Sequence, residues 1–319
     1  MHHILSRFIQ MLVVLFILSF VIFHLIEFMP GDATSILKAE NPKIKPHDLE
    51  RLIKQRGLDK PSYIRYFFWL KRIIQGELGY SFVYKVKVED MVGGRILTTL
   101  KLTIPTILIT LLIALPIGIL SALKQYSFFD YFINTSAFIG FSVPTFVWSL
   151  IAIFIFSQNL NLFPPGGMGT PGMEGFLNFD LITYIILPIA VLSFYDAGPW
   201  VRYVRATMLD VIKQDYIRTA RAKGLPEDVV IIKHAVRNIL MPFVTLVALH
   251  MPALFSGTLI VETVFGIPGM GRLLYDSVMK QDSDVAMSAF LLIAFMTLLF
   301  NFIADVIYTY IDPRIRYKK

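Results

Sequence analysis

The 319-residue sequence contains no cysteine, and only 17% of its residues are charged. The absence of cysteine excludes disulfide bonds, thiolate metal sites and cysteine nucleophiles. No GxxxxGKS or GxxxxGKT loop occurs, so the chain cannot hold a nucleotide phosphate in the P-loop manner, and HExxH and GxSxG are also absent. The histidines are scattered over different segments. We therefore expect no catalytic residue, no metal site and no cofactor, and any ATP must be hydrolysed by a partner.

Apolar residues are abundant: 55% of the side chains are hydrophobic and the mean hydropathy is +0.63. These values are typical of a polytopic membrane protein. The net charge of +7 is spread over loops between apolar runs, with no aromatic-basic module for bases, so membrane lipid and not nucleic acid is the expected partner. Because about 20 helical residues cross a bilayer, we predict an all-α fold with six transmembrane helices. They span 8–29, 97–122, 132–157, 181–201, 240–264 and 285–311.

The polar segments between these spans divide the chain into three parts. Residues 1–30 are predicted to be a cytoplasmic N-terminus and the first transmembrane helix, and residues 31–95 an extracytoplasmic helical region. Within that region, apolar stripes predict one helix that ends at Gly57 and a second, from Tyr63, that ends at Gly76. Residues 96–319 are predicted to be a five-helix core with a cytoplasmic loop at about 202–240.

The distribution of lysine and arginine predicts the orientation in the membrane. With the N-terminus inside, inner segments carry fourteen of these residues, eight of them from Arg202 to Arg237, whereas the short outer loops carry only Arg272 and Lys280. The basic residues of 31–95 weigh little, because long translocated segments do not follow the positive-inside rule. Both termini are therefore predicted to be cytoplasmic.

The charged segment 209–242 interrupts the apolar runs and is predicted to form a helix, a tight glycine turn and a second helix. Its first half has apolar residues at helical spacing, from Leu209 to Ala220, and Gly224 can end that helix. Pro226 suits the first turn of the second helix, where the helix dipole favours the acidic Glu227 and Asp228. We expect a compact knob on one membrane face.

Several motifs of this chain resemble those of one family. The loop residues Arg218-Thr219-Ala220, Gly224, His234-Ala235, Arg237-Asn238 and Pro242 resemble the cytoplasmic "EAA" loop of permease subunits in bacterial ABC importers. Arg218 replaces the usual Glu and Pro242 lies farther from the glycine, and both departures resemble the dipeptide, oligopeptide and nickel group. The segments GLDKP (57–61), GELGYSF (76–82), loop 158–180 and ETVFGIPGMG (262–271) are similar to that group as well.

This resemblance implies a type I ABC importer permease in a bacterial inner membrane that forms half of a translocation pathway. The implied partners are a second homologous permease, two cytoplasmic ATPase subunits and an extracytoplasmic substrate-binding protein. The implied coupling residues are Tyr216, Arg218, Thr219, Ala220, Arg221, Gly224, Pro226, Glu227 and Asp228. We expect a small outward contact face at Ala220 and a left-handed backbone at Gly224.

The outer turn 262–271 and the 31–95 region are expected to dock the binding protein. The docking candidates are Glu262, Gly266, Pro268, Gly269 and Arg272, and the pathway candidates are Ser142, Pro144, Asp196 and Asp305. Glu262 is expected to reach the outer interface, Asp196 to pair with Arg202 or Arg205 or to line the pathway, and Asp305 to pair with a basic group of a neighbouring helix.

Peptides are the favoured cargo, with nickel as the alternative within the same group. A rival class is an ATP-independent channel or secondary transporter, although no self-similar pair of halves is evident in the sequence. A membrane-embedded enzyme is the third choice.

Overall fold

The computed structural model describes residues 2–28, 59–169, 179–240, 243, 247 and 258–311. Every regular element in these ranges is helical, apart from one isolated bridge between Tyr80 and Lys87, so the predicted all-α class is confirmed. The predicted helix that ends at Gly57 and most of the predicted span 240–264 lie outside the described residues.

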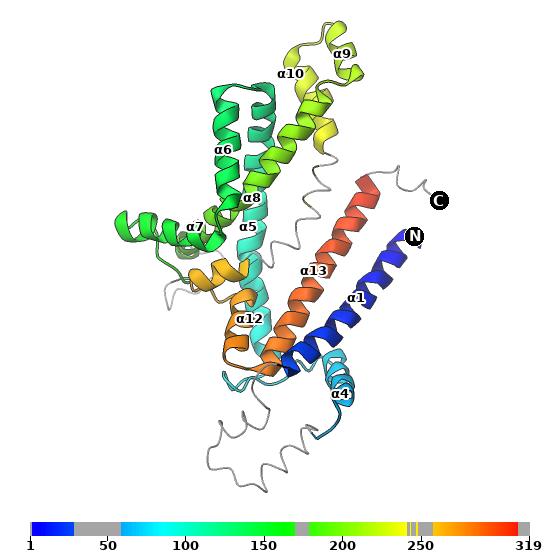
Figure 1. The fold of residues 1–319 in the computed structure, drawn as a ribbon, viewed down its shortest axis with the longest axis vertical. Helices are drawn as coiled ribbons and strands as arrows, with labels where there is room; N and C mark the ends of the chain where they lie inside the picture. The colour runs from blue at the N-terminus through cyan, green and yellow to red at the C-terminus, as the bar shows by residue number, and fades with distance from the viewer. Residues whose placement is uncertain are drawn as a thin grey trace.

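Four helices in the described part of the chain are long and apolar enough to cross a membrane (Figure 1). They are α1 (His2–Glu27), α5 (Val88–Leu123), α8 (Phe179–Val211) and α13 (Ser283–Ile311). The candidates become five if α6 (Phe128–Ser142) and the following segment, α7 (Thr145–Ala152) with the π-helical η1 (Ile153–Asn159), count as one span. α5 and α8 extend beyond the predicted spans 97–122 and 181–201.

The prediction of one continuous helix over 132–157 is wrong, because the chain bends by 103° between α6 and α7. Pro144 is the cause: its ring disfavours helical backbone at the preceding residue. Val143 is extended accordingly, at φ −91° and ψ 130°, and Pro144 precedes the first residue of α7. Pro105, Pro116, Pro188 and Pro199 lie inside α5 and α8 without breaking them, as transmembrane helices allow.

The helices form two packed groups. α8 packs against both α5 and α6, and α1 packs along α13 (Figure 1). Small residues allow the close approach in the first group: a Cβ on Gly118 would lie 2.7 Å from a Val204 atom, and one on Gly198 would lie 2.6 Å from the Ala137 carbonyl oxygen. These contacts fix α8 between its two neighbours.

The two ends of the molecule carry different short elements. α9 (Asp215–Ala222) and α10 (Glu227–Val229) lie at one end, and α4 (Ser62–Ile74) and α12 (Met270–Met279) lie toward the other (Figure 1). The start of α1 and the end of α13 point toward the end with α9 and α10. Assignment of that end to the cytoplasm stays a prediction from the charge distribution.

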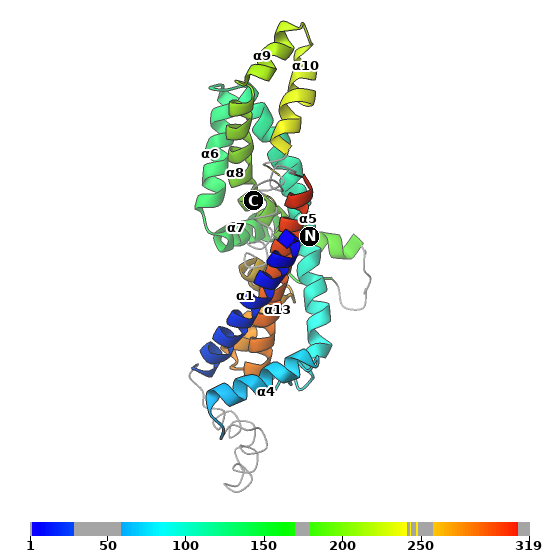
Figure 2. The same ribbon diagram turned by 90° about the vertical axis from the view of Figure 1, so that its right-hand side faces the viewer.

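Helix α4 confirms the second helix predicted in the 31–95 region, and Gly76 follows it with a φ of +86°. α4 lies across the ends of α1 and α13 (Figure 2). Tyr66 and Trp69 are buried against α1, with the Tyr66 hydroxyl 2.9 Å from the Ser19 hydroxyl. Tyr63 and Phe67 are exposed, so only part of the predicted apolar stripe packs on the bundle.

Candidate functional site

The predicted helix–turn–helix knob is present at the end of α8. α9 is followed by a turn, then by α10, the π-helical η2 (Val230–Val236) and a further helical turn to Leu240. The first helix is shorter than predicted, because α8 continues to Val211 and contains Leu209, and α9 begins only at Asp215. We call residues 212–240 the knob.

Gly224 closes α9 in a Schellman motif. The Gly224 N–H donates to the Arg221 carbonyl oxygen at 2.9 Å, and the Leu225 N–H donates to the Ala220 carbonyl oxygen at 3.4 Å. Gly224 has a φ of +74°, so the predicted left-handed conformation is confirmed. A Cβ at Gly224 would meet no atom within 4 Å, so the requirement for glycine here is conformational and not steric.

An ion pair that sequence reasoning missed bridges the turn. The Arg221 guanidinium donates from Nη2 to Glu227 Oε1 at 2.6 Å and from Nε to Glu227 Oε2 at 3.1 Å. This bond raises the pKa of Arg221 and holds the pKa of the Glu227 carboxyl below its ordinary value. Pro226 precedes α10 as its N-cap, one position earlier than predicted. A six-residue separation across a turn is no regular helical spacing, so this pair could not be predicted from residue spacing.

The inner face of the knob packs on the ends of α5 and α8. Its buried apolar residues form one cluster with two residues of those helices, and together they are Ala122, Met208, Ile217, Ala220, Val230, Ala235 and Ile239. The expectation of an outward contact face at Ala220 is therefore wrong: Ala220 is 6% exposed and faces the interior. The interior of the knob is therefore continuous with two spanning helices.

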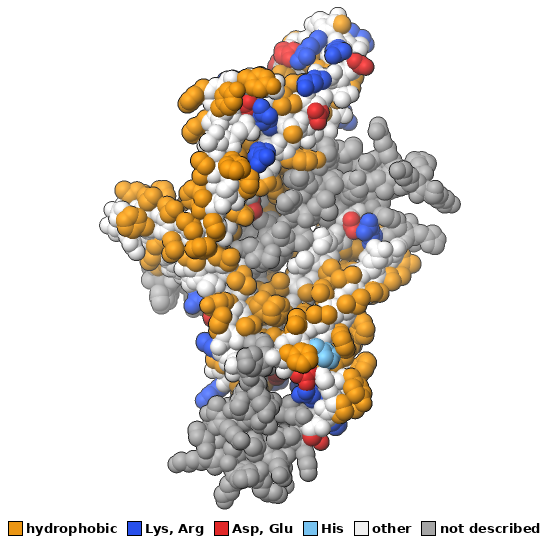
Figure 3. All heavy atoms as spheres, in the orientation of Figure 1, with side chains coloured by type: hydrophobic (Ala, Val, Ile, Leu, Met, Phe, Trp, Pro, Cys, Tyr) orange, Lys and Arg blue, Asp and Glu red, His pale blue; other side chains and the backbone are white. Residues whose placement is uncertain are grey.

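The exposed face of the knob, opposite its buried cluster, combines charged and half-exposed apolar groups. Tyr216 is 42% exposed and Leu225 39% exposed, and the exposed Arg218 lies 3.6 Å from Asp215. Partial burial raises the pKa of the Tyr216 hydroxyl. Lysine and arginine side chains gather over this end of the molecule, whereas hydrophobic side chains cover much of α1, α6 and α7 (Figure 3). Of the predicted coupling residues, only Ala220 is buried.

The outer turn 262–271 is built around a buried carboxylate. Glu262 is fully buried, so the expectation that it reaches the interface is wrong. It accepts hydrogen bonds from the Thr99 hydroxyl at 2.6 Å and from the Arg272 backbone N–H at 3.0 Å, at the start of α12. A Cβ on Gly269 would lie 2.2 Å from the Glu262 carboxyl carbon, so only glycine fits there. Glu262 thus ties α12 to α5.

The remaining docking candidates lie closer to the surface. Gly266, Pro268 and Arg272 are half-buried, and Gly266 has a φ of +66°. The Arg272 guanidinium donates to the Gly266 carbonyl oxygen, and the Gly167 N–H donates to the Phe265 carbonyl oxygen at 2.8 Å. The described part of loop 158–180 therefore packs directly on the outer turn.

The structure does not bring the four pathway candidates together. Ser142 and Pro144 are exposed at the α6/α7 bend, and Asp196 is partly buried in α8. Asp305 lies on α13, where it confirms the expected pairing through a 3.5 Å contact with Arg7 of α1.

The expected pairing of Asp196 with Arg202 or Arg205 is wrong, because neither arginine forms an ion pair with Asp196. Arg205 instead donates to both oxygens of the buried Asp130 on α6, at 2.6 and 2.7 Å. Ser121 and Asn134 also donate to Asp130, at 2.5 and 2.8 Å. This network joins the first turn of α6 to α8. It could not be predicted from local spacing, because Asp130 and Arg205 are 75 residues apart in the sequence.

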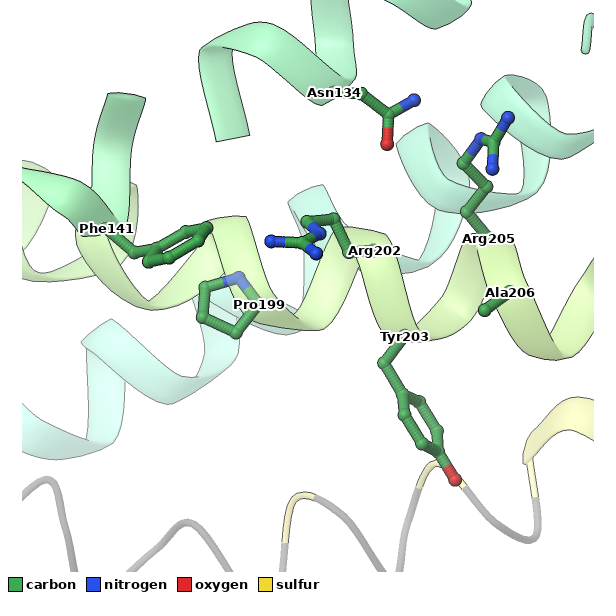
Figure 4. A pocket seen from close by; sticks show the side chains of 7 residues that line it. All are labelled: Asn134, Phe141, Pro199, Arg202, Tyr203, Arg205 and Ala206. Carbon is green, nitrogen blue, oxygen red and sulfur yellow. The ribbon is translucent and has the colours of Figure 1, made fainter. Parts of the chain in front are cut away.

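Next to this network lies a cavity of about 620 Å³ between α6 and α8 (Figure 4). Its lining residues are Asn134, Phe141, Pro199, Arg202, Tyr203, Arg205 and Ala206. The Arg202 guanidinium lies over the Phe141 ring, 5.4 Å from its centroid. No ion pair of Arg202 with a described residue is formed.

The apolar spans, with the knob packed on the ends of two of them, define a polytopic membrane protein. The family description that matches residues 114–317 is "Binding-protein-dependent transport system inner membrane component", and the N-terminal model of the same system matches residues 1–103. The chain belongs to this family. It is therefore a multi-pass inner-membrane permease subunit of an ABC importer and not an enzyme, and the ATPase resides on partner subunits.

Named relatives cover nearly the whole chain. The oligopeptide transport system permease protein AppB of Bacillus subtilis is 41% identical over 302 residues, 94% of each chain. The dipeptide transport system permease protein DppB of Escherichia coli K12 is 35% identical over 323 residues, 95% of this chain and 94% of its own. The glutathione transport system permease protein GsiC of Escherichia coli O6:H1 is 34% identical over 318 residues, 100% of both chains.

Proposed function

We propose that this chain is one of two permease subunits that together move di- or oligopeptides inward, driven by two cytoplasmic ATPase subunits and supplied by an extracytoplasmic binding protein. The observation that carries the peptide assignment is the 41% identity to an oligopeptide permease over 94% of both chains. The dipeptide and glutathione permeases among the relatives support the same substrate class. Neither nickel import nor an ATP-independent channel or secondary transporter is favoured by these relatives.

The knob is the coupling element in this proposal. Its helices are held together by the Schellman turn at Gly224 and by the Arg221–Glu227 ion pair. Its inner face is continuous with α5 and α8 through Ala122 and Met208. A rotation of the ATPase pair against Tyr216, Arg218 and the turn is therefore passed to α8 as a rigid-body movement, because a packed interior deforms little.

Alternating access follows from moving α8, which is packed between α5 and α6. Ser142, Pro144 and Asp196 are the pathway candidates on the α6–α8 part of the bundle, and Asp305 is the candidate on α13. At the opposite end, Gly266, Pro268 and Arg272 contribute the docking surface for the binding protein. Glu262 and Gly269 support that surface from inside.

Reconstitution tests this function directly. The chain is co-expressed with its second permease and its two ATPase subunits, reconstituted into liposomes and supplied with the binding protein. We expect uptake of labelled di- and oligopeptides that depends on ATP and on the binding protein, and no uptake of labelled nickel. Uptake without ATPase subunits would refute the importer mechanism, and nickel uptake without peptide uptake would refute the substrate class.

A further inference from the structure

The cavity between α6 and α8 carries an excess of positive charge. Two of its lining residues are arginines and none is acidic. Arg205 is neutralised by Asp130, whose two carboxylate oxygens are already occupied by Arg205, Ser121, Asn134 and the Tyr126 N–H. Arg202 forms no ion pair with a described residue and lies over the Phe141 ring, so in the described part of the chain its charge is available to an anion.

The cavity lies near the ends of α6 and α8 on the side of the knob. Arg202 is nine residues from the end of α8 and Asn134 is six residues from the start of α6. At about 1.5 Å per helical residue these positions lie about 9–14 Å from the helix ends. The exposed Tyr126 and Tyr131 mark the interface just above them. Basic pockets between spanning helices at this depth suit anionic headgroups.

The surroundings of the cavity are apolar. Phe132, Phe138 and Ile139 of α6 are exposed, and Phe141 and Ala206 line the cavity itself. Hydrophobic side chains also surround the few basic ones on this face of the molecule (Figure 3). A ligand that combines one negative charge with acyl chains fits both features.

We infer that this cavity binds the phosphodiester headgroup of an anionic phospholipid of the inner leaflet, with Arg202 as its principal ligand. In the inferred complex the Arg202 guanidinium donates to the phosphate oxygens. The Phe141 ring, which lies beside Arg202 in Figure 4, orients the guanidinium. Arg205 adds the N–H groups that Asp130 does not use. A bound lipid then rests against both α6 and α8, the helix that carries the knob, so the inner leaflet is linked to the moving part of the permease.

A transported peptide is a poorer fit to the same cavity. A zwitterionic peptide brings an ammonium group as well as a carboxylate, and no lining residue offers an acidic acceptor for it. A free phosphate fits the charge but makes no use of the apolar border.

Native mass spectrometry of the full-length chain in detergent, with added phosphatidylglycerol, tests the inference. Arg202→Gln should weaken phosphatidylglycerol binding by about fivefold or more, as expected for the loss of one interfacial charge. Lys124→Gln is the matched control, since Lys124 is an exposed cation at the same end of the bundle but outside the cavity. Lys124→Gln should retain wild-type binding. Equal binding by wild type and Arg202→Gln would overturn the inference.

A second variant and two competitors keep the test decisive. Ala206→Phe fills the cavity without changing its charge and should also lower phosphatidylglycerol binding, while zwitterionic phosphatidylethanolamine should bind weakly to every variant. Inorganic phosphate at millimolar concentration should not displace the lipid. Displacement by phosphate would assign the site to a free anion, and unchanged lipid binding with a raised KM for peptide in Arg202→Gln would assign the cavity to the transport path. Either result refutes the lipid site.

Discussion

Replacement of Gly224 by valine isolates the conformational requirement of the knob. Gly224 has a φ of +74°, a region that costs a non-glycine residue about 1–2 kcal/mol, and a β-branched residue more. A Cβ there meets nothing within 4 Å, so no clash adds to this strain. Since 1.4 kcal/mol is a factor of ten, local opening of the turn should become about 5–30 times more frequent.

Hydrogen exchange of the purified chain measures that opening. We expect the amides of α9, the turn and α10 to lose about 5–30-fold of their protection in Gly224→Val, while the amides of α5 and α8 keep theirs. Membrane abundance and pairing with the second permease should be normal, and copurified ATPase should fall. Gly224→Asn should show a smaller loss, because asparagine tolerates the left-handed region better.

A glycine with ordinary backbone provides the control. Gly93 lies inside α5, and a Cβ there also meets nothing within 4 Å. Gly93→Ala should leave exchange and ATPase recovery unchanged, or stabilise α5 slightly. Wild-type protection and wild-type ATPase recovery in Gly224→Val would refute both the strain argument and the coupling role of the turn.

Three further predictions concern buried and surface positions. Ala220→Asp places a carboxylate in the knob interior, so it should abolish copurification of the ATPases and make the knob sensitive to protease. The control Arg218→Ala should leave the knob protease-resistant. A protease-resistant knob in Ala220→Asp would contradict the observed packing. Glu262→Ala leaves buried donors without an acceptor and should lower the free energy of unfolding by about 1–3 kcal/mol in thermal unfolding. The control Glu77→Ala, at an exposed position, should not. Equal stability of Glu262→Ala and the wild type would contradict the structural role of Glu262. Arg272→Glu should weaken binding-protein docking measured by surface plasmon resonance while the ATPases stay bound, and unchanged docking after that reversal would remove Arg272 from the docking surface.

Local sequence signals identified the elements that depend on local physics. Gly224 and Gly76 each follow a helix with positive φ, because glycine alone adopts that conformation freely. Long apolar runs predicted α1, α5, α8 and α13, although α5 begins before its predicted span at Val88 and α8 continues past its predicted span to Val211. The bend at Pro144 was harder to predict, since four other prolines remain inside continuous helices.

Pairings between distant segments were not accessible to sequence reasoning. The resemblance to the EAA loop predicts an outward contact at Ala220, yet a small residue serves equally well inside a tight packing. Nothing in the sequence around Asp130 predicts its bonds to Arg205, because the two residues are far apart in the chain. Glu262 lies near the end of a span, and only its contacts with Thr99 and α12 reveal that it is fully buried.

The sequence alone determined the membrane class, the helical content and the turn of the knob, because hydropathy, helical spacing and glycine conformation act over a few residues. The tertiary structure decided which side chains face inward and which charges find partners. Burial and ion pairing depend on neighbours that are remote in the chain, as Arg205 with Asp130 and Glu262 with Thr99 demonstrate. The charge of Arg202 in the α6/α8 cavity became visible for the same reason: only the fold shows that Arg202 has no ion-pair partner among the described residues and that the Asp130 carboxylate is bound to Arg205.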